Sequence, residues 1–299
     1  MSKPNLIVLQ GIPGSGKTSY AKRLVHDNPN IDYYSSDDLR VEMFGNIDDQ
    51  SHNGELFNEL QKRIKNSLIS GHDAIFDATN INSKRRMNFL KDIENIDCHK
   101  KIVVMAIPFE VCLRRNWTRE RKVPDEVMMR MYKSWQTPAK WEGWDEIEVI
   151  TCDKDSFIKE LYKYLGIWNY YKYDQNNPYH TKTLGQHMVS AADYIHDNFG
   201  NSDDLLMAAM YHDIGKPFCK SQDNDGVSHY YGHENVGAYD MLARGYNLRV
   251  AQLINYHMYP LHWERYDYPE RMHEKYRKLW GDEFYKEIIY LHEADNKCS

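Results

Sequence analysis

The most specific chemical signal in this sequence of 299 residues is the segment GIPGSGKT, which runs from Gly11 to Thr18. It fits the pattern G-x-x-x-x-G-K-[ST] and lies between a short apolar stretch and a helical pattern. In this pattern backbone N–H groups close around phosphate oxygens, the lysine reaches the β- and γ-phosphates, and the hydroxyl ligates Mg²⁺. We therefore expect ATP or another NTP to bind here with Mg²⁺. The alternative is that the segment is only a glycine-rich turn with a surface lysine. The expected binding residues are Gly11, Gly14, Ser15, Gly16, Lys17 and Thr18, with Lys17 also catalytic and Thr18 also a metal ligand.

Chemistry on the side of the phosphate acceptor is indicated by Ser36-Asp-Asp-Leu-Arg40, which follows a predicted strand segment. A carboxylate at the carboxyl end of a parallel strand faces the crevice where α/β sheets bind ligands. From there Asp37 can accept the proton of an attacking hydroxyl, and Arg40 can clamp a phosphate of the acceptor. The spacing alone equally permits an aspartate that caps a short helix, with a solvated Arg40.

Two more polar clusters belong to the same half of the chain. Asp77 and Asn80 end another strand at the same edge of the sheet, so we expect both to contact the substrate. A dense basic segment contains Arg115 and Arg119. If it forms a lid over the triphosphate, its guanidinium groups neutralise charge on the transferring phosphoryl group. A solvated basic helix face is the alternative.

Histidines and aspartates in the second half of the chain follow the pattern H…HD…D. Imidazole nitrogens with carboxylate oxygens suit a first-row divalent cation such as Mn, Ni, Co, Fe or Zn, and a metal pair lowers the pKa of a bridging water. The expected ligands are His187, His212, Asp213 and Asp295, with His233 and His257 completing a second metal position. For any single histidine, a satisfied buried side chain is the alternative. Lys216 either meets the substrate phosphate or supplies charge at a helix end.

The elements that must position these residues differ between the two halves. Short apolar strands alternate with helical patterns up to about residue 152, which predicts an α/β domain with a parallel sheet and helices on both faces. Strands are indicated at 6–9, 74–77, 101–108 and 147–151, and helices at 18–26, 56–69, 84–93 and 125–135. From Phe157 onward only helical periodicity is found, which predicts an all-α domain. We therefore divide the chain into a first domain (1–155), a linker region (156–175) and a second domain (176–299).

Composition excludes several classes of protein. Hydrophobic residues make up 41% and charged residues 27%, and the formal net charge is −6, which argues against a bulk nucleic-acid coat protein. No apolar run approaches 18 residues and no cleavable leader is seen, so we expect no membrane span and no secretion. Five scattered cysteines without C-x-x-C spacing fit a reducing cytoplasm.

In the first half, GIPGSGKT, SSDDLR, DATNINSKRR and LRRNWTRERKVPDEVMMRMYKS occur in an order that resembles the kinase domain of bacteriophage-type polynucleotide kinases. The resemblance implies transfer of the ATP γ-phosphate to a 5′-hydroxyl of RNA or DNA. It also implies Asp37 as general base, Arg40 on the acceptor's 3′-phosphate, and Arg115 and Arg119 as lid residues on the donor. One departure is that Ala78 stands where that family places an acidic residue before Thr-Asn, with Asp77 one position earlier.

The second half resembles the HD-superfamily phosphohydrolases, in particular over HDIGKPFCKSQDNDGVSHYYGHENVGAYDML. The resemblance covers about 180–260 and resumes at Asp295. It implies metal-dependent hydrolysis of phosphomonoesters or 2′,3′-cyclic phosphates, with His187, His212, Asp213 and Asp295 as ligands.

Together the two patterns predict a bifunctional enzyme that heals RNA ends. A 5′-kinase would supply a 5′-phosphate, and the phosphohydrolase would clear a 2′,3′-cyclic, 2′- or 3′-phosphate, before a separate RNA ligase joins the ends. One alternative is a small-molecule or nucleoside kinase fused to a nucleotide phosphohydrolase. Another is a nucleic-acid-binding module with a degenerate HD domain.

Overall fold

A computed structural model describes residues 3–151, 172–177, 181–200 and 202–299. The chain divides into two compact units. Unit 1 comprises Met1–Met128 and Pro138–Ile150, and unit 2 comprises Met129–Thr137 and Thr151–Ser299. Most of the predicted linker region, 156–171, lies outside the described residues. Within the described ranges no helix is both long enough and apolar enough to cross a membrane.

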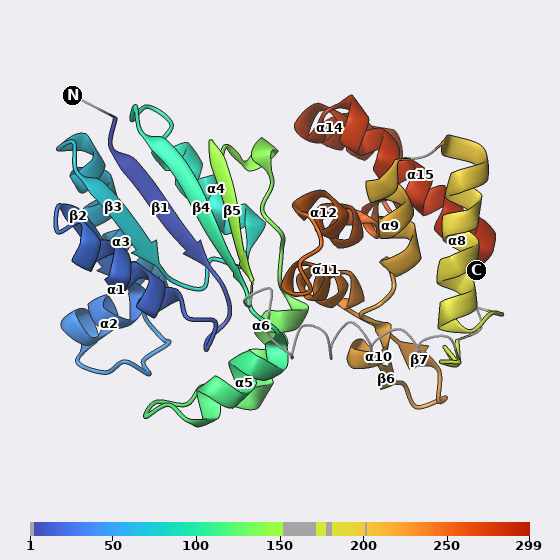
Figure 1. The fold of residues 1–299 in the computed structure, drawn as a ribbon, viewed down its shortest axis with the longest axis horizontal. Helices are drawn as coiled ribbons and strands as arrows, with labels where there is room; N and C mark the ends of the chain where they lie inside the picture. The colour runs from blue at the N-terminus through green and yellow to red at the C-terminus, as the bar shows by residue number, and fades with distance from the viewer. Residues whose placement is uncertain (1–2, 152–171, 178–180, 201) are drawn as a thin grey trace. The chain divides into compact units, whose positions relative to one another are not determined.

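Unit 1 is built on a five-stranded sheet with the order β2-β3-β1-β4-β5 (Figure 1). The strands are β1 (Asn5–Gln10), β2 (Ile31–Ser35), β3 (Asp73–Asp77), β4 (His99–Ala106) and β5 (Glu146–Thr151). β1 pairs in parallel with both β3 and β4, and β2 pairs in parallel with β3. The predicted parallel sheet is confirmed, and β1 lies at its centre, so the loop after β1 leaves the middle of the sheet's carboxyl edge.

Helices cover both faces of this sheet, as predicted. Successive strand residues point to opposite faces, and Leu9 and Ile75 pack with Ala21 of α1 on one face. On the other face Phe76 meets Phe89 of α4 edge to face, with ring centroids 5.4 Å apart. The helices of this part are α1 (Lys17–Asp27), α2 (Ser36–Phe44), α3 (Asn53–Ile69), α4 (Ser83–Asp92), α5 (Phe109–Trp117) and α6 (Asp125–Lys133), with a 3₁₀ turn η1 (Lys140–Glu142).

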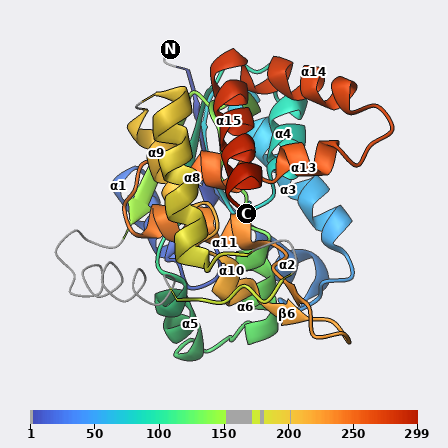
Figure 2. The same cartoon turned by 90° about the vertical axis from the view of Figure 1, so that its right-hand side faces the viewer.

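Unit 2 is helical, as predicted, with one addition. Its described helices are α8 (Leu184–Phe199), α9 (Asp203–Tyr211), α10 (Lys216–Cys219), α11 (His233–Ala243), α12 (Leu248–Tyr256), α13 (Tyr259–Trp263), α14 (Pro269–Trp280) and α15 (Asp282–Cys298). α8 and α15 lie side by side, which brings the last helix of the chain against the first one described in this unit (Figure 2). The addition is a small antiparallel hairpin of β6 (Ser221–Gln222) and β7 (Ser228–His229). Strands of two residues are too short to show an alternating pattern, which is why periodicity did not indicate them.

The core of unit 2 also contains a segment that precedes β5 in the chain. Residues 129–137, which begin inside α6, belong to this unit. Tyr132 and Trp135 both meet Tyr239 of α11 edge to face, and Trp135 is fully buried. The backbone N–H of Thr137 donates to Asn255 Oδ1 at 2.8 Å. The chain therefore passes between the units within α6, after Thr137 and after Ile150, and the predicted boundary at 155 follows the last of these points.

Trp135→Ala tests how much this segment contributes to unit 2. Removing a buried tryptophan side chain is expected to lower the free energy of unfolding by about 3–5 kcal/mol. Urea unfolding followed by circular dichroism measures it. Trp117→Ala is the matched control because Trp117 is 54% exposed. Equal loss of stability in both variants would contradict a core role for Trp135.

Candidate active sites

The loop after β1 has the conformation that a phosphate cradle requires. Gly14 and Gly16 have φ angles of +82° and +94°, a backbone region that residues with a side chain rarely adopt. A Cβ at Gly14 would also collide with the carbonyl oxygen of Cys112 in α5. The N–H of Gly11 donates to the Thr79 carbonyl at 3.0 Å, which ties the loop to the segment after β3. Gly16 caps α1, so the helix N-terminus and its dipole lie at the loop.

Lys17 lies inside the loop. Its side chain is buried, and its Nζ donates to the carbonyl of Ile12 at 3.0 Å. Burial lowers the pKa of Lys17, while the nearby Asp77 acts to raise it and Arg119 acts to lower it. An ammonium group desolvated in this way gains strongly from an arriving anion, which suits the predicted contact with a triphosphate.

Asp77 lies directly beside Thr18. β3 pairs with β1, with Asp77 opposite Leu9, and Asp77 Oδ2 accepts hydrogen bonds from Thr18 Oγ1 at 2.7 Å and from the Tyr33 hydroxyl at 2.9 Å. Burial, together with Asp77, raises the pKa of Tyr33, so this hydroxyl remains a donor at neutral pH. A hydroxyl next to a carboxylate is the oxygen donor set by which phosphate-binding loops hold Mg²⁺.

The sequence pattern predicted Asp77 only as a substrate contact, because Asp77 and Thr18 are 59 positions apart in the chain. Only the adjacency of β3 and β1 brings them together. Asp77 is thus a candidate for holding Mg²⁺ through, or together with, Thr18.

Asp77→Asn is expected to raise the Mg²⁺ concentration that gives half-maximal kinase rate by about 10–100-fold, because an uncharged partner orients and polarises the metal site less well. Initial rates measured over a Mg²⁺ titration test this. Asp73→Asn is the matched control, since Asp73 begins the same strand and binds Asn5 instead. A Mg²⁺ requirement that is unchanged in Asp77→Asn would contradict the assignment.

On the acceptor side, the cap of α2 is Ser35 and not Asp37. Ser35 Oγ accepts from the N–H of Asp38 at 3.2 Å, so the Asp37 carboxylate is not used as a helix cap. Asp37 Oδ2 instead pairs with Arg121 at 3.2 Å, and Arg121 also binds Asp48 at 2.8 Å. The basic segment thus reaches the candidate general base.

Arg40 is buried, and its guanidinium donates to the carbonyl of Asp49 and to Asn53 Oδ1. It is therefore not the solvated side chain of the alternative interpretation. A contact between Arg40 and an acceptor phosphate stays a prediction, and it would require these hydrogen bonds to be exchanged.

The other basic residues divide into two groups. Arg115 Nη1 donates to the carbonyl of Gly14 at 3.4 Å, so it lies at the phosphate loop, and Arg119 is close enough to influence the pKa of Lys17. Arg86, in contrast, forms a buried ion pair with Glu142 at 2.6 Å and donates to the carbonyl of Asn80. Asn80 has a positive φ of 46° and donates to the carbonyl of Leu9 at 2.9 Å. Arg86 and Asn80 thus stabilise the carboxyl edge of the sheet.

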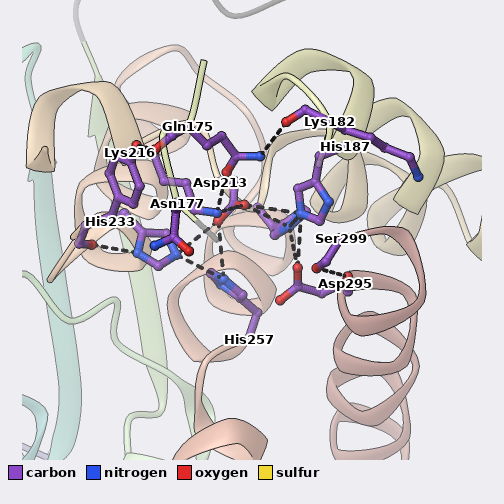
Figure 3. A network of polar contacts seen from close by, with 12 residues as sticks. Gln175, Asn177, Lys182, His187, Asp213, Lys216, His233, His257, Asp295 and Ser299 are labelled. Carbon is purple, nitrogen blue, oxygen red and sulfur yellow. Dashed lines mark hydrogen bonds and ion pairs between the residues drawn. The ribbon is translucent and has the colours of Figure 1, made fainter. Parts of the chain in front are cut away.

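In unit 2, all six predicted metal ligands are brought together (Figure 3). They come from the interior of α8, the ends of α9, α11 and α12, and the last turns of α15. The first group is His187, His212, Asp213 and Asp295, and the second is Asp213, His233 and His257. Within each group the ligand atoms lie within 4.8 Å of one another.

The four histidines all present Nε2 to the cluster because their Nδ1 atoms face backbone carbonyls. Those carbonyls belong to Cys298, Ala209, Tyr230 and Ile254, at 2.7–3.2 Å. A carbonyl can only accept, so each Nδ1 donates to its carbonyl and Nε2 is the nitrogen turned toward the cluster. Nε2 of His187 lies 3.0 Å from Nε2 of His212, and Nε2 of His233 lies 3.3 Å from that of His257. Ring nitrogens this close to one another, with carboxylate oxygens beside them, suit a shared proton or a bound metal cation.

Asp213 links the two groups. Its Oδ2 lies 3.3 Å from His187 Nε2, and its Oδ1 lies 3.0 Å from His233 Nε2. Burial would raise the pKa of Asp213, but Lys216 and His212 hold it well below its usual range. One carboxylate can therefore serve two cations.

The electrostatics of the cluster favour positive charge. Burial lowers the pKa of His212, but Asp213 and Asp295 outweigh burial and raise that pKa to about 10. Burial, with His212 and His233, lowers the pKa of His257 to about 3, so this ring remains a neutral lone-pair donor. The carboxylates therefore draw either a proton or a metal cation into the cluster, and the two compete.

Comparisons with known protein families find one match in each half of the chain. Residues 6–138 match the AAA domain family, and residues 179–297 match the HD domain family. The first match contains the phosphate loop and the second contains all six candidate metal ligands, in the order of P-loop domain and then HD domain that the sequence predicted.

Individual relatives are more distant. L-seryl-tRNA(Sec) kinase of Methanococcus maripaludis is 28% identical over 167 residues, covering 54% of this chain and 65% of the relative. A protein of Autographa californica nuclear polyhedrosis virus, whose proposed activities are polynucleotide kinase and RNA ligase, is 26% identical over 52% of this chain and 25% of its own length. The chain thus spans less than two thirds of either relative. A chain in the Pnkp1/Rnl/Hen1 RNA repair complex is 20% identical, with a TM-score of 0.38 over 45% of this chain and 44% of that one.

Proposed function

We propose, from the premise that this chain joins a P-loop domain to an HD domain, that it is an RNA end-healing enzyme. Its first unit phosphorylates a 5′-hydroxyl end, and its second unit removes a 2′,3′-cyclic, 2′- or 3′-phosphate. A separate RNA ligase then joins the healed ends. The observation that carries this proposal is the presence, in one chain, of a triphosphate cradle and a six-ligand metal cluster.

In the kinase reaction the 5′-oxygen attacks the γ-phosphorus of ATP, and the bond from that phosphorus to the β-bridging oxygen breaks, which releases ADP. Asp37 accepts the proton of the hydroxyl. Lys17, Arg115 and Arg119 stabilise charge on the phosphoryl group as it transfers. Asp37 is paired with Arg121, so this pair must open before the carboxylate can act. Bound Mg²⁺ would neutralise the triphosphate at Thr18 and Asp77.

In the hydrolase reaction the histidines and aspartates would hold divalent cations, which would supply Lewis acidity toward water and the phosphate. The protein's own contribution is the placement of the ligands. Nδ1 contacts fix every ring, and Asp213 sets the spacing of the two groups. Lys216 lies 2.6 Å from Asp213, and we expect it to donate to an oxygen of the substrate phosphate.

RNA is the favoured substrate, and DNA ends are the alternative. The viral relative's name combines polynucleotide kinase with RNA ligase, which supports RNA or DNA ends and a downstream ligase. One incubation tests the proposal: an RNA with a 5′-hydroxyl and a 2′,3′-cyclic phosphate, together with ATP, Mg²⁺ and Mn²⁺. Mass analysis of both termini should show a 5′-phosphate and the loss of the cyclic phosphate. Failure at both ends would overturn it.

The kinase relative from Methanococcus favours a second candidate for unit 1, which is transfer to a serine-like hydroxyl carried by tRNA. Comparing a 5′-hydroxyl oligonucleotide, seryl-tRNA and free nucleosides as acceptors distinguishes this candidate, and the small-molecule kinase, from the 5′-kinase.

A further inference from the structure

Lys216 places a buried ammonium group at the edge of the metal cluster. Its Nζ lies 2.6 Å from Asp213 Oδ2 and donates to Gln175 Oε1 at 2.9 Å. The ring of Tyr230 lies 5.6 Å from the same Nζ. Because a buried ammonium is costly unless it is paired, these partners determine where the charge can rest.

The side chain of Gln175 cannot turn freely. It is only 1% exposed, its Nε2 donates to the carbonyl of Lys182 at 3.2 Å, and its backbone carbonyl accepts from the Tyr230 hydroxyl. With Nε2 used in this way, Oε1 is directed at Lys216 (Figure 3). The amide is therefore a fixed acceptor for the ammonium.

Gln175 comes from a strap, residues 172–177, that precedes the range matched by the HD family. The strap is fastened to the hairpin of unit 2: the N–H of Ser228 donates to the carbonyl of Asn176 at 3.1 Å, and Asn177 Nδ2 donates to the carbonyl of Ser228 at 2.8 Å. The strap thus holds Gln175 beside Lys216, at the edge of the cluster of candidate metal ligands.

We propose that Gln175 is a positioning residue that holds the Lys216 ammonium in place to receive an oxygen of a phosphate group. This inference rests on the proposed phosphohydrolase function. Divalent cations on Asp213 weaken its attraction for Lys216, because they draw on the same carboxylate oxygens. Gln175 then becomes the partner that keeps Lys216 at the cluster. The ligand class is a terminal or cyclic phosphate, and inorganic phosphate is its simplest representative.

The experiment measures binding of inorganic phosphate to the Mn²⁺-loaded full-length chain by calorimetry. Gln175→Ala should raise the phosphate Kd about tenfold while the Mn²⁺ content stays at the wild-type level. The KM for a 2′,3′-cyclic phosphate end should rise in parallel, with a much smaller change in kcat. Combined with Lys216→Met, Gln175→Ala should cause no further loss, because its effect acts through Lys216.

Asp174→Asn is the matched control. Asp174 lies next to Gln175 on the strap but is exposed, and asparagine keeps the side-chain oxygen that accepts from the N–H of Asn176, so the phosphate Kd of this variant should stay close to wild type. A fall in Mn²⁺ content in Gln175→Ala, or a full additional loss in the Lys216→Met background, would overturn the inference. If phosphate binding behaves as expected but no RNA end is hydrolysed, only the proposed function fails.

Discussion

Lys17→Ala is expected to reduce 5′-phosphorylation about 10³-fold, because the variant lacks the cation that contacts the transferring phosphoryl group. The wild-type Nζ lies inside the loop, where burial amplifies its interaction with an anion. The measurement is kcat/KM for transfer from radiolabelled ATP to an oligonucleotide with a 5′-hydroxyl.

Two comparisons make this prediction specific. Lys22→Ala on the same helix removes an exposed lysine and should leave the kinase rate near wild type. The phosphohydrolase activity of Lys17→Ala should also be retained, since all six candidate metal ligands belong to unit 2. Joint loss of both activities in a folded Lys17→Ala variant would count against two independent sites.

Asp213→Ala is expected to do the opposite of Lys17→Ala: it should lose the phosphohydrolase activity and keep the kinase activity. Asp213 is the carboxylate shared by both ligand groups, so its removal should reduce phosphohydrolase activity at least about 10³-fold. The kinase rate should be unchanged. Phosphate release from a 2′,3′-cyclic end and the metal content after dialysis are the two measurements.

Asp213→Asn keeps the volume of the side chain and guards against misfolding. In wild type, Mn²⁺ at 100 times its Kd should stabilise the folded unit by about 2.7 kcal/mol, and a chelator should remove that gain. Asp213→Asn should show little of this shift in Tm, whereas Asp193→Ala, on an exposed position of α8, should retain it. If Mn²⁺ raised the Tm of Asp213→Asn as much as that of the wild type, Asp213 would not be a ligand.

Local motifs carried most of the prediction. The phosphate loop is one unbroken segment of sequence, and so is the His-Asp pair. Their chemistry constrains the residue types so strongly that the candidate phosphate and metal ligands could be named before the fold was known. Their convergence follows from helical packing, since the ligands lie on or at the ends of five helices.

The remaining features depend on pairings between distant segments. The place of Asp77 beside Thr18 requires the strand order β3-β1, and the burial of Arg86 requires Glu142, 56 residues away. Gln175 belongs to no recognisable motif. A single glutamine in a turn-rich segment has no regular spacing to other polar residues, so its contact with Lys216 could not be predicted. The helix predicted at 125–135 includes Trp135, but its pattern does not tell which core receives that side chain.

The contribution of residues 129–137 to unit 2 has a consequence for exchanging parts of such a chain. Trp135 and Tyr132 are encoded ahead of β5, yet they fill the core around Tyr239. A chimaera that exchanges only the residues after β5 would therefore leave Trp135 and Tyr132 without Tyr239.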